Sequence, residues 1–330
     1  RNWNEYLIDQ VFRRKPWLLR MVLKDLAKAR GGGFPAIYQP VKMSDFGAVI
    51  NVVKWTGEVT ASPIQNPIVA AQWNMCGYAV VMDTLLTEFS LMQGAGAPYA
   101  VIDSIKERFT DFYFALIDAI DTKLYGKPSD ANEIEGLDSA IDDGTNVATY
   151  GGLSRSEYPN WASVIYNYNA ETVGTTIPDY VTNKEHWKIV SWYLAKYRKN
   201  VPGDVPGVIL TSYSVFRALI DSMAGIERTI VQNIDEVSLT RGAGIQQLLI
   251  DGIPVIPLDK ITTDTLYYCN FNYWEFPTNA DLFFNMLGPA DLLAVNVLGW
   301  RIALLFGGNF ICYAPRYNFK VINFPVGISL

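Results

Sequence analysis

The chain has 330 residues, which exceeds the size at which one hydrophobic core usually stops growing, so two or more lobes are expected. Half of the residues are hydrophobic and only 18% are charged, while 9 Trp, 19 Tyr and 16 Phe make the chain rich in aromatics. This composition is typical of surfaces that other subunits cover, although a large core gives the same composition. The most apolar tract, residues 292–306, contains Asn296 and Arg301 and is too short to span a bilayer, and no segment resembles a secretory signal, which predicts a soluble protein.

The net charge of −6 is unevenly distributed. Residues 1–30 carry eight basic and three acidic side chains, whereas the remaining 300 residues carry 19 basic and 30 acidic ones. A basic arm on an acidic body can contact nucleic acid or an acidic neighbour. The commoner explanation of such a run is a solvated helix face.

The first predicted element is a helix that begins at Pro16 and is stopped by three glycines at 31–33. Its apolar stripe consists of Leu18, Leu19, Val22, Leu23 and Leu26. Residues 34–66 follow, with prolines around short β-like runs such as 48–55. This pattern predicts a long extended hairpin.

The strongest helical pattern follows Pro98 and ends at Gly126 and Pro128. Apolar residues recur there at spacings of three and four, namely Val101, Ile105, Phe109, Phe112, Leu116, Ile120 and Leu124. A helix of about 27 residues is about 40 Å long at 1.5 Å per residue. We interpret it as a structural spine, because such a stripe is more often core than a cofactor pocket.

A connector rich in Gly and Asp, residues 124–161, follows this helix and closes on Arg155 and Trp161. It contains no array of metal ligands, no nucleophile with a base and no phosphate-binding loop. Such particular content without chemistry favours a subunit built to fit against copies of itself.

The middle region is predicted to mix helices and strands in one lobe. One helix covers 179–199, with Thr182 and Glu185 as a capping box, and another covers 212–224. Short strands are expected at 208–210, 248–250, 253–256 and 266–271, with Asp251-Gly252 as a two-residue hairpin turn.

The tail from Gly299 is predicted to return to β-structure, with strands at 301–306, 309–313 and 317–324. Such a sheet can pair with strands that precede the long helix, which would bring the two ends of the chain into one lobe.

The titratable residues give a weak case for catalysis. Cys76, Cys269 and Cys312 are odd in number, widely spaced and in apolar surroundings, so buried reduced thiols are expected rather than a disulfide framework or a zinc ribbon. The one histidine, His186, lacks any motif context and is interpreted as a surface or capping residue.

Two glycine clusters, 31–33 and 242–244, match neither a P-loop nor a dinucleotide fingerprint. Asp138, Asp142 and Asp143 lack the spacing of a calcium loop and are interpreted as a solvated acidic loop. The sequence therefore predicts no catalytic, cofactor-binding or metal-binding residue.

Ordered sequence pieces carry a resemblance to a known family. They are LYG at the end of the long helix, GLDSAI, TYGGLSRSEYPNW, LTSYSVFRALIDSMAG, DGIPVIPLDKI and GGNFICYAPRYNFKVINFP. In this order they resemble tailed-phage major capsid proteins of the Hong-Kong-97-type fold, from about residue 65 to the C-terminus. Residues 1–64 match that family in layout rather than in motif.

The resemblance implies an α+β fold of four parts. These are an N-terminal arm (1–33), an extended loop (34–66), a peripheral domain with the spine helix (67–150 and 290–330) and a mixed axial domain (151–289). The residues expected to contact neighbouring subunits are Arg13, Arg14, Arg20, Phe34, Tyr38, Phe46, Trp55, Arg155 and Trp161.

The resemblance further implies a shell protein rather than an enzyme, without a cofactor. Its partners would be copies of itself in pentamers and hexamers, portal or decoration proteins, and packaged double-stranded DNA held weakly, with no membrane. The protein would be part of a virion capsid assembled in the host cytoplasm.

Three other readings stay open. A cellular nanocompartment shell of the same fold is the nearest. An α/β enzyme acting on carbohydrate is motivated by the aromatic and acidic residues. A nucleic-acid-binding protein with a basic arm is the third.

Overall fold

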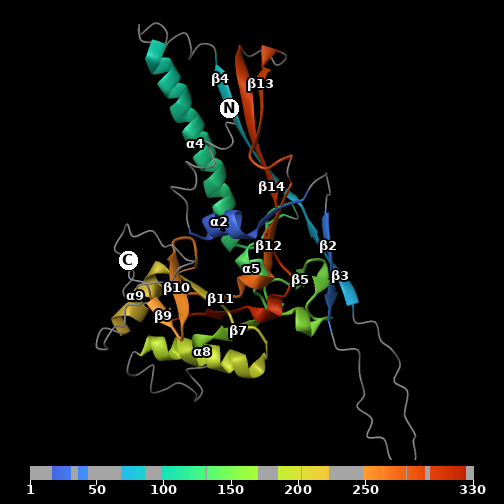
Figure 1. Ribbon diagram of the computed structural model, residues 1–330, viewed down its shortest axis with the longest axis vertical. Helices are drawn as coiled ribbons and strands as arrows, with labels where there is room; N and C mark the ends of the chain where they lie inside the picture. The colour runs from blue at the N-terminus through green and yellow to red at the C-terminus, as the bar shows by residue number, and fades with distance from the viewer. Residues whose placement is uncertain are drawn as a thin grey trace, which may run out of the picture. The chain divides into compact units, whose positions relative to one another are not determined.

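The structure is a computed structural model that describes residues 17–30, 36–43, 68–85, 98–130, 132–169, 185–201, 203–222, 248–262, 264–279, 281–293 and 298–324. For residues 29–30, 84–85 and 98–109 it describes the backbone only. The chain forms two units (Figure 1). Unit 1 contains Arg1–Ile37, Trp73–Ser139 and Glu275–Ile311, and unit 2 contains Tyr38–Gln72, Ala140–Trp274 and Cys312–Leu330.

Unit 1 is built on a mixed sheet of order β1-β12-β14-β13, with β4 also paired to β14 and β15 to β12. The strands are β1 (Ala27–Arg30), β4 (Cys76–Leu85), β12 (Trp274–Asn279), β13 (Asn285–Asp291), β14 (Gly299–Gly308) and β15 (Ile311–Cys312). Strands β4 and β14 pair antiparallel along their whole length, from Gly299 opposite Leu85 to Gly308 opposite Cys76. The predicted pairing of the tail with strands before the long helix is therefore confirmed.

The long helix α4 covers Pro98–Tyr125, 28 residues, as the apolar spacing predicted. Figure 1 shows it running beside β4, β14 and β13. The described part of the helix has five buried apolar or aromatic side chains on its inward side, namely Tyr113, Leu116, Ile117, Ile120 and Leu124. Burial of this stripe stabilises a helix of such length in water. None of the helices in the described ranges is long and apolar enough to cross a membrane.

The N-terminal helix is shorter than the sequence predicted. It consists of α2 (Trp17–Met21) and a π-helical turn, η1 (Val22–Leu26). Ala27–Arg30 then leave the helix as β1, because they pair in parallel with Phe276–Asn279 of β12. Leu18, Leu19, Val22 and Leu23 of the predicted stripe are buried.

A strand at the start of the predicted extended hairpin pairs with a strand that follows the predicted range of 34–66. Strands β2 (Ala36–Lys42) and β3 (Ile68–Asn74) form a two-stranded sheet. The strand predicted at 48–55 lies outside the described residues.

Unit 2 contains a six-stranded sheet of order β7-β16-β11-β8-β10-β9. Its strands are β7 (Val164–Asn167), β8 (Val208–Ser212), β9 (Leu248–Ile250), β10 (Ile253–Leu258), β11 (Leu266–Cys269) and β16 (Phe319–Ile322). The predicted two-residue turn joins β9 to β10, with φ of 53° at Asp251 and 79° at Gly252. Both residues have the positive φ that a type I′ turn requires.

Two helices, α8 (His186–Asn200) and α9 (Tyr213–Ser222), contribute to the core of unit 2. Aromatic stacking organises that core, since the ring of Phe319 lies 4.0 Å from Tyr268 and 4.3 Å from Tyr197 between centroids. The described N-cap of α8 is Glu185, whose side chain caps no backbone N–H. Thr182, the other residue of the predicted capping box, and the predicted helix start at 179 lie outside the described residues.

The tail divides between the two units rather than lying wholly in a peripheral domain of 67–150 and 290–330. Strand β14 belongs to the sheet of unit 1, whereas β16 pairs with β11 and β7 in the sheet of unit 2. Residues 275–289, predicted within the axial part, fall in unit 1. The reason is that strands near one another in the sequence join different sheets. Strands β12, β13 and β14 pair in the sheet of unit 1, whereas β11 and β16 pair in the sheet of unit 2.

Candidate functional site

The connector of unit 2 is the first candidate site. After α5 (Leu137–Ala140), the chain forms a loop, a small hairpin of β5 (Thr149–Tyr150) and β6 (Leu153–Ser154), and the turn η2 (Pro159–Trp161). Gly151 and Gly152 close the hairpin with φ of 55° and 73°, in the left-handed region that glycine adopts without steric cost. The sequence TYGG is thus explained by the geometry of one turn.

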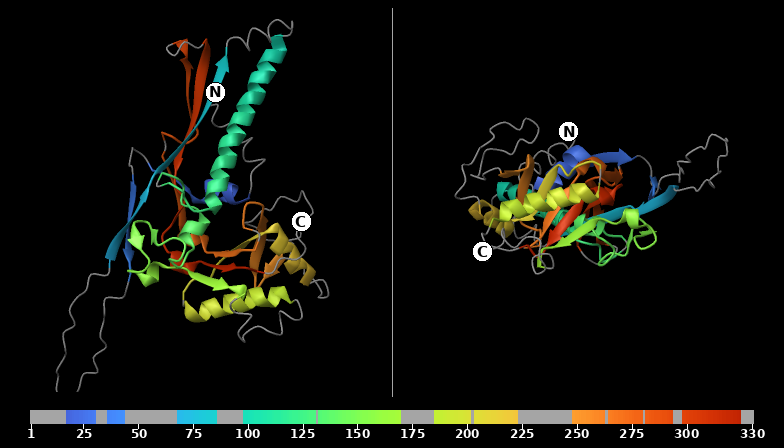
Figure 2. Two further views of the ribbon diagram at one scale, coloured as in Figure 1. Left: turned by 180° about the vertical axis from the view of Figure 1, so that it is seen from behind. Right: turned by 90° about the horizontal axis from the view of Figure 1, so that it is seen from below.

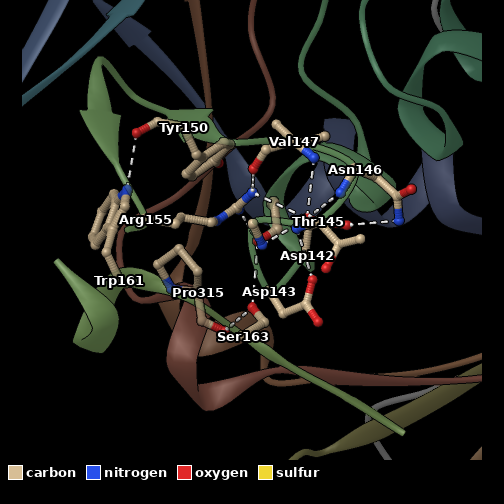
Figure 3. Close-up of polar contacts among 12 residues, drawn as sticks. Asp142, Asp143, Thr145, Asn146, Val147, Tyr150, Arg155, Trp161, Ser163 and Pro315 are labelled. Carbon is tan, nitrogen blue, oxygen red and sulfur yellow. Dashed lines mark hydrogen bonds and ion pairs between the residues drawn. The ribbon is translucent and has the colours of Figure 1, made fainter. Parts of the chain in front are cut away.

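A fully buried carboxylate, Asp142, organises this connector. Its Oδ1 accepts hydrogen bonds from the backbone N–H groups of Gly144, Asn146 and Val147 at 2.8, 3.2 and 3.1 Å (Figure 3). Its Oδ2 accepts from the side-chain amide of Asn146 at 3.3 Å. A single side chain therefore holds the loop that follows it. The prediction of a solvated acidic loop is wrong for Asp142, although Asp143 is exposed.

Two buried cations accompany Asp142. Arg155 Nη1 lies 3.9 Å from Asp142 Oδ1, and Lys320 Nζ lies 3.6 Å from Asp142 Oδ2. Arg155 also donates to the carbonyls of Val147 at 2.7 Å and Ala140 at 2.8 Å, so its guanidinium ties both sides of the loop (Figure 3). Buried charges persist only when they are paired and hydrogen-bonded, which is the arrangement seen here.

Burial by itself would raise the pKa of Asp142. Hydrogen bonds from the N–H groups of Val147 and Gly144, together with the charge of Lys320, more than offset it and lower the pKa below its ordinary value. Asp142 is therefore ionised at neutral pH, and its charge offsets part of the positive charge of Arg155 and Lys320.

Trp161 and Tyr150 complete the connector cluster, by which we mean Asp142, Tyr150, Arg155, Trp161 and Lys320. Trp161 Nε1 donates to the Tyr150 carbonyl at 2.9 Å, and the Tyr150 hydroxyl accepts from the Cys312 N–H at 2.8 Å. The Arg155 guanidinium lies 5.3 Å from the centre of the Tyr150 ring. These contacts join the hairpin to the C-terminal segment of unit 2.

The connector cluster is held together by hydrogen bonds, ion pairs and ring contacts. Burial raises the pKa of the Cys312 thiol to about 12, so the sulfur is not a nucleophile at neutral pH. Within the described ranges, no three His, Cys, Asp or Glu side chains are grouped so as to hold a metal ion. All three cysteines are free and buried, as predicted.

An exposed apolar surface on unit 1 is the second candidate site. Alternation along β4 and β14 gives the three-stranded ribbon β4-β14-β13 two faces. One face is covered: Phe306 contacts Phe284, whose ring lies 5.4 Å from Tyr113 of α4. The other, which we call the open ribbon face, carries Ala79, Val81, Leu287, Ala303 and Leu305.

The open ribbon face has its apolar centre in register across three strands. Ala303 of β14 lies opposite Val81 of β4 on one side and Leu287 of β13 on the other. Val81 and Leu287 are 51% and 50% exposed. Next along the same face, Arg301 forms a two-pronged ion pair with Asp83, at 2.7 Å for each bond, which leaves that end neutral.

The turn region of this ribbon is also apolar. Leu293 and Leu298 lie between β13 and β14, and they and Trp300 are all exposed. Several exposed apolar side chains gathered on one ribbon indicate an interaction site in a folded protein. Sequence reasoning missed it, because the alternation in β4 and β13 is broken by Gly, Pro and Asp.

The residues predicted to contact neighbours fall into three groups. Tyr38 is 64% exposed on β2, and Arg20 is half-buried on α2. Arg155 and Trp161 are each only 2% exposed, so their side chains lie inside unit 2 and have no surface to offer a neighbour. For these two, the structure replaces the predicted contact with an internal role. Arg13, Arg14, Phe34, Phe46 and Trp55 lie outside the described residues.

His186 is the first residue of α8 and is half-buried, with its ring 5.9 Å from that of Phe324. This position agrees with a structural histidine at a helix start. Lys320 was missed by sequence reasoning, since a lysine in a short apolar strand gives no signal of a buried ion pair. Asp142 could have been found from Asp-Asp-Gly, because an Asp side chain often accepts from the backbone two residues on.

No protein-family model and no curated protein matches the sequence. Solved structures do match the fold. The match to the capsid of cyanophage A-1(L) has a TM-score of 0.63 at 16% identity, and the alignment covers 93% of this chain and 92% of that chain. An encapsulin, SrpI from Synechococcus elongatus PCC 7942, has a TM-score of 0.54 at 10% identity and covers 95% and 89%. The capsid of a native GTA particle has a TM-score of 0.52 at 11% identity and covers 92% and 90%.

Such low identities show the fold alone, and they show it over nearly the whole chain. The chain is a mixed helix-and-strand protein. More particularly, it has the Hong-Kong-97-type fold of phage capsid proteins, as the resemblance implied.

Proposed function

We propose that this chain is a major capsid protein. Its copies would associate into pentamers and hexamers and close an icosahedral head shell around the double-stranded DNA of a tailed phage, within a virion assembled in the host cytoplasm. The observation that carries the proposal is the likeness to the cyanophage capsid subunit over more than nine-tenths of both chains.

The open ribbon face supports the proposal from the chain itself. Of the large apolar side chains that are exposed in the described residues, six lie on β4, β13, β14 or the turn between the last two. They are Val81 and Leu287 on the open ribbon face, Leu293 and Leu298 in the turn, and Met286 and Trp300 in register with the opposite face. A subunit that works alone has no use for so much exposed apolar surface on one ribbon, whereas a neighbouring copy can bury it. Contacts that are repeated by rotation close into rings.

The connector cluster supports a second part of the proposal. It fixes the geometry of the chain at the start of the Ala140–Trp274 segment of unit 2. The mechanism is then assembly, with the arm (1–33) and the extended loop (34–66) reaching other subunits. Arg13, Arg14, Arg20, Phe34, Tyr38, Phe46 and Trp55 remain the candidate contact residues there.

The experiment is a size measurement on the purified full chain by electron microscopy and light scattering. We expect closed shells or rings of five and six copies. A particle that is monomeric at every concentration overturns the proposal, and turnover by monomers in a screen of carbohydrate substrates favours the enzyme reading instead.

A nanocompartment shell is the second candidate, favoured by the likeness to the SrpI encapsulin. Shells purified from a producing host and treated with nuclease distinguish the two. Protected double-stranded DNA of uniform length supports the phage head, and a protected protein cargo without DNA supports the nanocompartment.

A further inference from the structure

We propose that the exposed side of helix α8 is a binding surface for the phosphate backbone of double-stranded DNA. The inference rests on the proposed head-shell function and adds to it the part of the subunit that meets the packaged DNA. Three properties of α8 carry it: its charge, the alignment of its lysines and the way aromatic rings hold them.

The charge of α8 is opposite to that of the rest of its unit. Residues 186–200 contain Lys188, Lys196, Arg198 and Lys199 and no acidic residue. The other described residues of unit 2 carry six basic and nine acidic side chains. A local concentration of basic groups on an otherwise acidic unit is the electrostatic pattern of a surface that meets polyphosphate.

The lysines lie along one side of the helix. Four residues follow one another at spacings of four, four and three, namely Lys188, Trp192, Lys196 and Lys199. We call these four residues the lysine line. The buried side of the helix is formed by other residues, namely Ile189, Val190, Tyr193, Leu194 and Tyr197. Viewed from below, α8 lies at the front of unit 2 with no other helix or strand of that unit in front of it (Figure 2).

The length of the lysine line suits a duplex. Eleven residues of helix extend about 16 Å. Double-stranded DNA presents one phosphate charge per about 1.7 Å of its axis, so several phosphates lie within reach of this line. Lys188 is partly neutralised by an ion pair with Glu185 at 2.7 Å, which makes Lys196 and Lys199 the principal contacts.

Aromatic rings hold Lys196 in position. Its ammonium lies 4.7 Å from the centre of the Tyr166 ring and 4.9 Å from that of Trp192. A cation held over two rings loses less side-chain entropy when it binds an anion than a freely moving lysine does. Trp192 also packs edge-on against the buried Tyr193, so the ring is itself fixed.

The test uses the full chain before assembly, a labelled duplex of about 30 base pairs and salt from about 50 to 200 mM. The variant is Lys196→Gln with Lys199→Gln. The matched control removes two exposed charges elsewhere, Arg217→Gln with Lys127→Gln, and so has the same net charge. We expect the slope of log affinity against log salt to fall by about 1.8 in the variant, about 0.9 per lost contact, and to stay closer to the wild-type value in the control.

Equal losses in variant and control overturn the inference, because they report net charge alone, and an unchanged slope in the variant also overturns it. Electron microscopy of the same samples keeps the outcomes separate. Failure of the wild-type chain to form shells overturns the proposed function. Loss of shells in the lysine variant with an unchanged slope assigns the lysine line to a neighbouring subunit and overturns only the DNA inference.

Discussion

The connector cluster of unit 2 and the open ribbon face of unit 1 handle their side chains in opposite ways. In the connector, charged residues that are normally exposed are buried and hydrogen-bonded, as Asp142 and Arg155 show. On the ribbon, apolar residues that are normally buried are half-exposed, as Val81 and Leu287 show. The first arrangement specifies the local shape of unit 2, and the second leaves apolar surface that, under the proposed function, a neighbouring copy buries.

This comparison has a measurable form. Changes in the connector cluster should lower the free energy of unfolding of the subunit, whereas changes on the ribbon should leave it nearly constant and alter association.

Asp142→Asn should have the largest effect. It keeps the size of the side chain but leaves Arg155 and Lys320 buried without their carboxylate, which we expect to cost about 3–5 kcal/mol. The measurement is the urea midpoint of the unassembled chain. The control is Asp143→Asn, an exposed neighbour whose Oδ1 accepts from Thr145 N–H, as an amide oxygen also can. Equal effects of the two substitutions would contradict the assigned role.

The contribution of Asp142 should depend on pH. Because its pKa is lowered in the folded protein, its stabilisation is complete above the ordinary Asp value of about 3.9 and is lost as pH falls below it. The gap in urea midpoint between wild type and Asp142→Asn should therefore be widest near neutral pH and narrow below about pH 4. Glu133, whose pKa is lowered to about 2 by Lys123 and Ser129, titrates on the same acid side and is present in both proteins. A gap that stays constant from neutral to acid pH would argue against a charged Asp142.

The aromatic residues of the connector cluster should contribute less to the free energy of unfolding than Asp142 does. Tyr150→Phe removes the acceptor of the buried Cys312 N–H, and we expect it to cost about 1–3 kcal/mol. Tyr158→Phe, which removes a hydroxyl from a more exposed ring, should change the unfolding free energy by less than about 0.5 kcal/mol. The same denaturation experiment measures both, and a Tyr150→Phe protein as stable as the control would remove Tyr150 from the cluster.

These effects also show where sequence reasoning succeeds. The length of α4 was predicted because its apolar residues keep one helical period over many turns, and the β9–β10 turn because Asp-Gly has few alternatives. Both signals are local. The pairing of the tail with strands before the long helix was also predicted, although no strand was placed at β4 itself.

What sequence reasoning missed depends on distant partners. Lys320, which pairs with Asp142, is 178 residues away in the sequence. Because the local sequence does not reveal this cation, the Asp-rich loop was interpreted as solvated. The N-terminal helix ends at Leu26 because Ala27–Arg30 pair with β12 instead of continuing the helix. The sequence around these residues contains no information about that distant strand. The same limit applies to Arg155 and Trp161, whose types suggested an interface and whose surroundings made them core.

The smallest change in unfolding free energy should come from the ribbon, in the double substitution Val81→Thr and Leu287→Gln. Both side chains are half-exposed in the subunit, so its urea midpoint should shift by an amount equivalent to less than about 0.5 kcal/mol. Association should respond much more, because the substitutions put polar groups into a contact that is meant to be apolar. We expect the concentration at which rings or shells form to rise at least about tenfold, equivalent to about 1.4 kcal/mol, measured by light scattering. Val205→Thr, an exposed apolar position of unit 2, is the control and should leave that concentration unchanged. If the ribbon variant assembles like wild type while its stability falls, the open ribbon face belongs with the connector cluster as part of the subunit's own fold, and the contrast between the two regions does not hold.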